Sequence, residues 1–204
     1  MKKVSEKKVT KIRNKPSRKQ AEEAVKTLIQ WAGDNPDREG LVETPKRVVN
    51  AYKEFFNGYE SKPEQILSKT FDEVEGYDEM VIVRDIAIES HCEHHMVPFI
   101  GIAHIGYIPN KRIVGISKLA RIADVFAKRL QTQETMTAQI ADTINEVLKP
   151  KGVAVVIDAQ HQCMTTRGTH KTESSTITSR MLGLFRTNSN TRNEFMNLIN
   201  SVNK

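Results

Sequence analysis

The chain has 204 residues with 31 Lys or Arg against 25 Asp or Glu, a formal net charge of +6. This length suits one domain, or one domain with an appendage, and allows a sizeable hydrophobic core. There is no recognised signal peptide and no apolar run near the ~20 residues that a membrane span needs. We therefore expect a cytoplasmic protein that has no membrane partner.

The positive charge is concentrated at the start of the chain, where residues 1–19 hold nine Lys or Arg and one Glu. This segment has few apolar residues and no periodicity, so we expect a disordered basic tail. Such charge is enough for non-specific contact with phosphates, but no recognised nucleic-acid-binding motif follows it, and we do not expect a nucleic-acid partner.

Residues 20–78 are expected to form an N-terminal helical region. Apolar residues at helical spacing predict a first helix over residues 25–32. Thr44 precedes Pro45, the pattern of an N-cap followed by proline at the first helical position, and predicts a second helix that extends to Gly58.

Residues 79–204 are expected to form the catalytic domain, with a C-terminal helix. The pattern predicts strands at residues 80–89, 99–108, 153–163 and 174–182, and helices at residues 119–126, 136–148 and 194–202. Ser117 is expected to cap the first of these helices, and Thr191 and Glu194 to form a capping box on the last. The resulting order, ββααββ before the closing helix, indicates an α+β fold.

The only two cysteines each lie close to histidine, in Cys92-Glu-His-His95 and His161-Gln-Cys163. Thiolate and imidazole are the ligands that Zn²⁺ prefers, and a site with three protein ligands leaves a position open for water. Cys-x-x-His spacing lets one turn deliver Cys92 and His95 to an ion. Cys163 is the candidate third ligand, on the same face of the predicted strand as His161. The sequence therefore predicts a zinc hydrolase.

Spacing alone does not decide whether His94 or His95 binds the metal. If His95 is the ligand, His94 is available to donate or accept protons. Two buried free thiols, or a disulfide, are the alternatives to a metal site. Only two cysteines and no signal peptide favour a metal or catalytic role over a crosslink.

Candidate substrate contacts lie elsewhere in the sequence. Glu134, with Gln133 beside it in the segment between two predicted helices, can accept paired hydrogen bonds from a planar N–H edge such as that of guanine. Several basic side chains are suited to phosphate, although each alone is more often an exposed charge: Lys118, Arg121, Lys128, Arg129 and Arg167.

From about residue 20 to the C-terminus, the chain resembles the GTP cyclohydrolase I family. The resemblance is carried by Glu43-Thr-Pro-Lys-Arg-Val48, Cys92-Glu-His-His95, Gly115-Ile-Ser-Lys-Leu-Ala-Arg121, Gln131-Thr-Gln-Glu134, Asp158-Ala-Gln-His-Gln-Cys163, Arg167-Gly168 and Asn190-Thr-Arg-Asn-Glu-Phe195. It implies zinc-dependent hydrolysis of the guanine ring of GTP at C8, with release of formate and formation of 7,8-dihydroneopterin triphosphate, the first step of pterin and folate biosynthesis.

The same resemblance implies roles for individual residues. Cys92, His95 and Cys163 would bind zinc, and His94 and His161 would form an acid/base pair. Glu134, with Gln133, would hold the purine edge. The ribose and triphosphate would be bound by Ser117, Lys118, Arg121 and Arg167, with Arg47 reaching the site of a neighbouring subunit.

The fold implied by the resemblance is the tunnelling fold, in which antiparallel ββααββ sheets close into a barrel by oligomerisation. It implies a homodecamer with sites between subunits, which would also remove exposed sheet edges.

Two other functions fit part of the pattern. The chain could be another tunnelling-fold purine or pterin enzyme, such as an NADPH-dependent reductase with a nucleophilic cysteine, although two cysteines together with His95 favour a metal. It could also be a non-enzymatic zinc-stabilised assembly or a nucleic-acid-binding protein, with His94 or His161 as a fourth zinc ligand.

Overall fold

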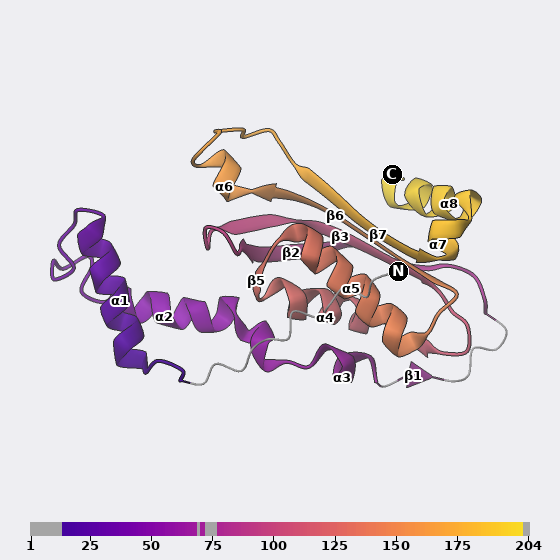
Figure 1. Cartoon of the computed structure of the whole chain (residues 1–204), viewed down its shortest axis with the longest axis horizontal. Coiled ribbons are helices and arrows are strands. Elements are labelled where there is room, and N and C mark those ends of the chain that lie inside the picture. The colour runs from indigo at the N-terminus through magenta and orange to yellow at the C-terminus, as the bar shows by residue number, and fades with distance from the viewer. Residues whose placement is uncertain (1–13, 69, 72–76, 202–204) are drawn as a thin grey trace. The chain divides into compact units, whose positions relative to one another are not determined.

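The computed structural model describes residues 14–68, 70–71 and 77–201 (Figure 1). Most of the predicted basic tail lies outside the described residues, as do residue 69 and residues 72–76 of the predicted N-terminal helical region. The chain divides into two compact units, Met1–Asn57 and Gly58–Lys204.

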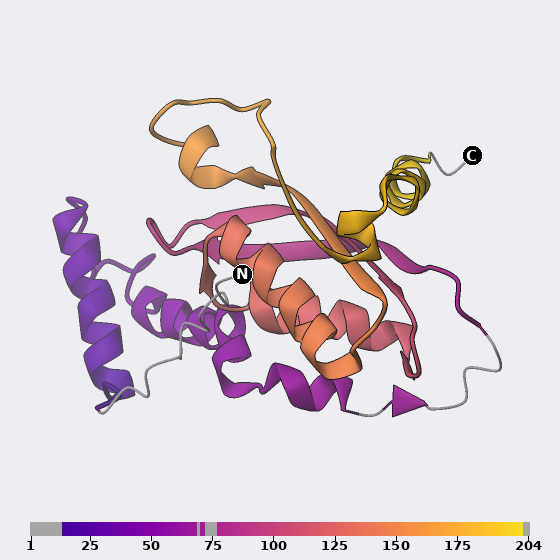
Figure 2. The same cartoon turned by 45° about the vertical axis from the view of Figure 1, so that its right-hand side comes forward.

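The second unit is built on a five-stranded sheet in the order β5-β2-β3-β6-β7 (Figures 1 and 2). The strands are β2 (Val81–Cys92), β3 (Pro98–Ile108), β5 (Leu130–Gln131), β6 (Gly152–His161) and β7 (Thr176–Gly183). The long strands pair antiparallel, whereas β5 pairs parallel with the end of β2. The predicted α+β class is therefore observed, with the four long strands near their expected positions.

Helices cover both faces of this sheet, as Figure 2 shows. The helices α4 (Ile116–Ala127) and α5 (Gln133–Leu148) pack on one face, and α7 (Leu184–Thr187) and α8 (Ser189–Asn200) pack on the other. The core under α8 is tight, because a Cβ on Gly106 of β3 would lie 2.8 Å from the ring of Phe195. The shorter elements are η1 (Asn57–Glu60), α3 (Pro63–Leu67), β1 (Thr70–Phe71), β4 (Ile113–Val114) and α6 (Gln162–Thr165).

The segment that follows Asn57 belongs to the second unit. Leu67 of α3 is fully buried in the main core, and the backbone N–H of Gly58 donates to the carbonyl of Lys128 (3.0 Å). The partner of Gly58 thus lies far along the chain.

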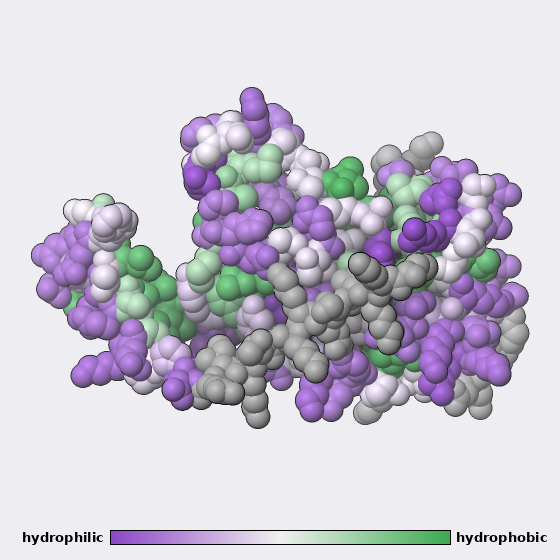
Figure 3. All heavy atoms as spheres, in the orientation of Figure 1, coloured by the Kyte–Doolittle hydropathy of each residue, from purple (hydrophilic) through white to green (hydrophobic). Residues whose placement is uncertain are grey.

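The first unit consists of α1 (Arg18–Trp31) and α2 (Thr44–Phe55). Ser17 and Gln20 form a capping box, so the last residues of the predicted tail are helical. α1 buries none of its residues, and Trp31 is 89 % exposed. Figure 3 shows hydrophobic residues at the surface of these helices.

Three predicted helix caps are wrong. Glu43 occupies the cap position of α2, so Thr44 is already helical, and α4 begins at Ile116, which places Ser117 inside its first turn. α8 is capped by Asn188, whose side-chain oxygen accepts from the backbone of Asn190 and Thr191 (2.9 and 3.2 Å), instead of by Thr191. Each of these helices starts one or more residues earlier than predicted.

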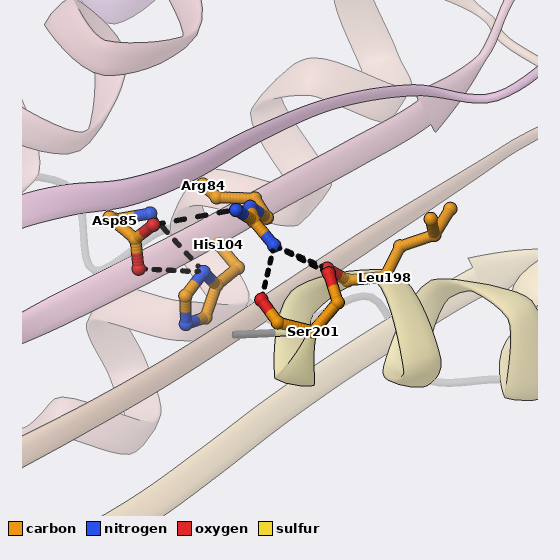
Figure 4. Close-up of polar contacts among 5 residues, drawn as sticks. All are labelled: Arg84, Asp85, His104, Leu198 and Ser201. Atoms are coloured by element: carbon orange, nitrogen blue, oxygen red, sulfur yellow. Dashed lines mark hydrogen bonds and ion pairs between the residues drawn. The ribbon is translucent and has the colours of Figure 1, made fainter. Parts of the chain in front are cut away.

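A polar cluster joins the end of α8 to β2 (Figure 4). Arg84 donates to the carbonyls of Leu198 and Ser201 (2.7 and 2.9 Å) and to the hydroxyl of Ser201 (2.8 Å). The next residue, Asp85, has a positive φ of 55° at a register shift in β2, and its N–H donates to Nδ1 of His104 (3.2 Å). These contacts stabilise both the irregularity in β2 and the C-terminal end of α8.

Within the ranges that the structure describes, no helix has both the length and the apolar character required to cross a membrane.

Candidate metal and catalytic site

The sheet topology brings distant parts of the sequence together at one end of the second unit. β2 ends at Cys92, which pairs with Gln131 of β5 just before α5 begins. β6 ends at His161, which pairs with Phe99 at the start of β3. The two cysteine–histidine clusters and the start of α5 therefore meet at the same end of the sheet.

A tight turn between β2 and β3 presents the first cluster. The carbonyl of Cys92 accepts from the backbone N–H of Met96 (2.8 Å), and the N–H of Cys92 donates to the carbonyl of Val97 (2.9 Å). Met96 has a positive φ of 56°, which lets the chain reverse within these few residues. The turn is held against β5 by a bond from the N–H of Glu93 to the carbonyl of Gln131 (2.9 Å).

Three side chains converge into a group that could hold a metal ion. One ligand atom from each of Cys92, His95 and Cys163 lies within 4.8 Å of the others, the only such group found among the described residues. Cys92 is buried, Cys163 is half-buried and His95 is exposed. Both cysteines are free thiols in the structure, and no disulfide joins them.

The predicted backbone conformation of Cys163 is wrong. β6 ends at His161, and Cys163 lies in the short helix α6. It therefore approaches Cys92 from a helical turn and does not share a strand face with His161. The ladder between β3 and β6 ends at the pair of Phe99 with His161, so residues beyond His161 are released from strand pairing.

The chemistry of these donors fits a bound zinc ion. Burial, together with the adjacent Cys92 thiol, raises the pKa of the Cys163 thiol. Two thiols pointing at one another are poor acids without a cation, whereas a divalent cation between them favours both thiolates. Two sulfurs and one imidazole form a donor set typical of zinc.

His161 lies beside this group and is held on two sides. Its ring stacks on Phe99, with centroids 4.6 Å apart and planes 9° from parallel. Its Nε2 is 2.7 Å from Oε1 of Gln133. Burial lowers the pKa of His161, and the nearby carboxylate of Glu134 opposes that effect.

The two predicted purine contacts differ in exposure. Both lie in the first turn of α5, which is capped by the Thr132 side chain, and not in a loop between helices. Glu134 is exposed, whereas the side chain of Gln133 is only 1 % exposed and is hydrogen-bonded to the protein. The structure thus leaves Glu134 accessible to a ligand and turns Gln133 inward.

Two further predicted residues lie next to the metal-binding group. Nη1 of Arg167 is 3.1 Å from Nε2 of His95. His94 is exposed, and its ring is perpendicular to that of His95 with centroids 6.3 Å apart. This region therefore combines thiol, imidazole and guanidinium groups.

The other predicted phosphate and ribose contacts are not brought to this end of the sheet within one chain. Ser117, Lys118 and Arg121 lie in the first half of α4. α4 follows β4, whose Val114 is tied to the hydroxyl of Tyr107 near the far end of β3 (3.3 Å). Most of β3 separates that end from the metal-binding group, roughly 25 Å at the rise of an extended strand. Arg47 belongs to α2 in the first unit.

Comparison with known proteins identifies the family. The model of the family described as GTP cyclohydrolase I matches residues 21–200. This chain belongs to the GTP cyclohydrolase I family. The enzyme family expected from the sequence motifs is therefore confirmed.

Similar proteins named GTP cyclohydrolase 1 match this chain over almost their whole length. GTP cyclohydrolase 1 of Hyphomonas neptunium is 60% identical over 184 residues, which cover 90% of this chain and 89% of the relative. The enzyme of Maricaulis maris is 57% identical over 188 residues, 92% of each chain. That of Brucella suis is 57% identical over 196 residues, 96% of this chain and 92% of the relative.

Among solved structures, the archaeosine synthase QueF-Like in the apo form is matched with a TM-score of 0.41 and 13% identity, covering 51% of this chain and 93% of that chain.

Residues that sequence patterns missed support the candidate site of this GTP cyclohydrolase I family member. Phe99 stacks on His161, and Thr178 bonds to the amide of Gln133. Neither stands out in the sequence, because an isolated Phe or Thr in a strand is ordinary. Only the register of β3, β6 and β7 places them at the site.

Proposed function

We propose that this chain hydrolyses the guanine ring of GTP at C8, releases formate and forms 7,8-dihydroneopterin triphosphate, the first step of pterin and folate biosynthesis. The observation that carries the proposal is the convergence of Cys92, His95 and Cys163 beside His161, close to the start of α5. Family membership supports the same activity.

In this proposal Cys92, His95 and Cys163 hold zinc. A bound zinc ion supplies a Lewis acid that activates water near neutral pH. Three protein ligands suit a catalytic site, whereas structural zinc usually has four. The free thiols fit a reducing compartment, and we propose that the protein works in the cytoplasm.

The neighbouring imidazoles would move protons during ring opening. Breaking the C–N bonds of the purine requires protons to be delivered to nitrogen, and two histidines suit two transfers. His161 is half-buried and held in place, whereas His94 is exposed. The depressed pKa of His161 favours its neutral form, which can accept a proton.

Glu134 would hold the guanine edge, because its exposed carboxylate can accept hydrogen bonds from the ring N–H and the exocyclic amine. Arg167 would contact the triphosphate, since its guanidinium already lies at the metal-binding group.

The remaining phosphate and ribose contacts would come from a second copy of the chain. Ser117, Lys118 and Arg121 lie at the start of α4, where Gly115 at the cap position provides no side-chain hydrogen bond. Such a helix start can bind phosphate through its backbone N–H groups and its dipole. Since α4 starts at the far end of β3 from the metal-binding group, a complete site would use the α4 of a neighbour.

Two surfaces support this self-association into a tunnelling-fold barrel and a homodecamer. β7 lies at one edge of the sheet, and an edge strand gains hydrogen bonds by pairing with a neighbour. α1 has exposed apolar side chains, among them Leu28 and Trp31. Arg47 of α2 would reach the site of a neighbouring subunit.

The decisive experiment is a GTP turnover assay with and without a chelator. Wild-type protein is expected to release formate and to yield a product that becomes fluorescent on oxidation, and chelation should abolish both. Turnover that is unaffected by complete metal removal would refute the proposal, as would the absence of formate release from GTP by the metal-loaded protein.

Subunit sharing can be tested by mixing two inactive variants. Cys163→Ser removes a metal ligand, and Arg121→Ala removes a phosphate contact. If each site combines the metal residues of one chain with the α4 of another, random equimolar mixing restores about a quarter of the sites. No recovery after denaturation and joint refolding would contradict shared sites.

A further inference from the structure

The amide of Gln133 can take only one orientation. Its Nε2 lies 3.1 Å from the carbonyl of Ile157 and 2.8 Å from that of Thr176, and it is 3.1 Å from Oγ1 of Thr178. Carbonyl oxygens only accept hydrogen bonds, so the NH₂ group must face them. Reversing the amide would place its oxygen against two other oxygens in a buried position, and Gln133 is only 1 % exposed.

This orientation determines which nitrogen of His161 carries a proton. Oε1 of Gln133 faces Nε2 of His161 at 2.7 Å. Since Oε1 can only accept, Nε2 must carry the hydrogen of this bond. In the neutral ring, Nδ1 is then the nitrogen with a free lone pair.

The plane of the ring is constrained as well. Phe99 is fully buried and lies parallel to the imidazole, with centroids 4.6 Å apart. The stacking on Phe99 restrains the face of the ring, and the hydrogen bond to Gln133 restrains its edge. Together they hold both the orientation and the tautomer of His161.

We infer that Gln133 is a positioning residue for His161 and that its side chain does not read the purine. Through the proton held on Nε2, Gln133 leaves Nδ1 of His161 as the nitrogen that exchanges protons with the substrate. This inference rests on the proposed GTP hydrolysis for its kinetic consequence, whereas the tautomer itself can be measured without turnover.

The kinetic test compares Gln133→Met with a matched control, Gln131→Met. Gln131 is also buried, at 4 % exposure, and its amide donates to the carbonyl of Phe126 and to Oε1 of Gln139 (3.0 and 2.9 Å). Methionine preserves the length of the side chain in both variants and removes the amide.

We expect Gln133→Met to lower kcat for GTP by about 10²-fold through misplacement of His161, with KM within about twofold of wild type. Zinc content should match wild type in both variants. The control should keep kcat and KM within about twofold of wild type, because its hydrogen bonds do not reach His161.

Three kinetic results would overturn the inference. A rise in KM with kcat unchanged would mean that the side chain contacts the purine. An equal loss of kcat in Gln131→Met would mean a general packing effect, and wild-type kinetics in Gln133→Met would mean no role. Should Gln133→Met not fold, Thr178→Val replaces it. This change removes one of the bonds that orient the amide, and we expect a smaller fall in kcat at unchanged KM, whereas unchanged kcat would refute the inference.

The spectroscopic test separates this inference from the proposed function. Solid-state NMR of ¹⁵N-histidine-labelled, zinc-loaded protein should show His161 with hydrogen on Nε2, and Gln133→Met should mix the two tautomers. A His161→Gln sample assigns the signal. Hydrogen on Nδ1 in the wild type would overturn the inference even if GTP is hydrolysed. Absence of wild-type turnover would instead refute the proposed function. The measured tautomer of His161 would then still decide whether Gln133 orients that ring.

Discussion

Loss of the metal is expected to destabilise the second unit as well as to stop turnover. The proposed ligands come from the turn after β2 and from α6, so the metal ties together segments that separate when the chain unfolds. Cys163→Ser is the sharpest perturbation. It exchanges sulfur for oxygen at nearly constant shape, and a serine hydroxyl does not provide the thiolate that zinc prefers.

The magnitude follows from binding to the native state alone. With free zinc at about 100 times its dissociation constant, binding contributes about 2.7 kcal/mol to the free energy of unfolding. For a domain of this size, 1 kcal/mol shifts Tm by about 2–4 °C. Chelation should therefore lower the Tm of the wild type by roughly 5–10 °C.

Differential scanning calorimetry with zinc and with a chelator measures this shift. Thr166→Ala provides a matched control, because Thr166 is exposed directly after α6 and its hydroxyl donates only to the carbonyl of Gln162 (2.7 Å). The control should keep the zinc-dependent shift, whereas Cys163→Ser should lose most of it and contain little zinc.

An unchanged zinc-dependent shift in Cys163→Ser would refute the assignment of this residue as a ligand. A wild-type protein that binds no zinc at micromolar concentration and melts at the same temperature with a chelator would refute the metal site itself.

Further predictions concern recognition, packing and pH. Glu134→Gln should lower kcat/KM for GTP by about 10–100-fold, because it removes a charged hydrogen-bond acceptor, and normal kinetics would exclude it from the purine site. Phe195→Ala should lower the free energy of unfolding by about 3–5 kcal/mol in urea titrations, because this buried ring packs on the second face of the sheet. Leu198→Ala changes a half-exposed position of the same helix and should lower the free energy of unfolding much less. Equal losses in the two variants would contradict the packing argument. Burial lowers the pKa of His104, so the unfolded chain takes up the proton first and stability falls as the pH drops below about 6.5. His104→Gln should flatten this fall between about pH 7 and about pH 5, and an unchanged slope would show that other groups cause it.

The cysteine and histidine clusters show how much of the candidate site the local sequence pattern could predict. Cys92 and one histidine of the His94–His95 pair could be assigned to one ion because a short turn limits where their side chains can go, whereas the choice of His95 came from the family resemblance. Cys163 was proposed as the third ligand, but its backbone was wrongly predicted to be a strand. The strand ends at His161 because its pairing with β3 ends there, and the local sequence of β6 does not show where β3 begins. The predicted helix caps failed because α2 and α4 have Glu43 and Gly115 at their cap positions without a side-chain cap bond, and because Asn188 caps α8 in place of Thr191.

Gln133 and Glu134 show most clearly what the sequence could not predict about the candidate site. As neighbours in the sequence they received the same role, yet one is buried against β6 and β7 and the other is exposed. The direction in which a side chain points at the start of a helix depends on how the helix docks on the sheet. That docking angle is set by contacts across the whole second unit.

By itself, the sequence determined the α+β class, the positions of the long strands and helices, the donor set for a metal and the enzyme family. The enzyme family follows from the resemblance of several motifs to a known family, whereas the other features depend on residue type, local spacing and periodicity within short segments. Only the tertiary structure decided which donors converge, how His161 is held and which predicted contacts lie at the far end of the sheet from the metal-binding group. Those outcomes depend on strand register and helix docking, which are set by pairings between segments far apart along the chain.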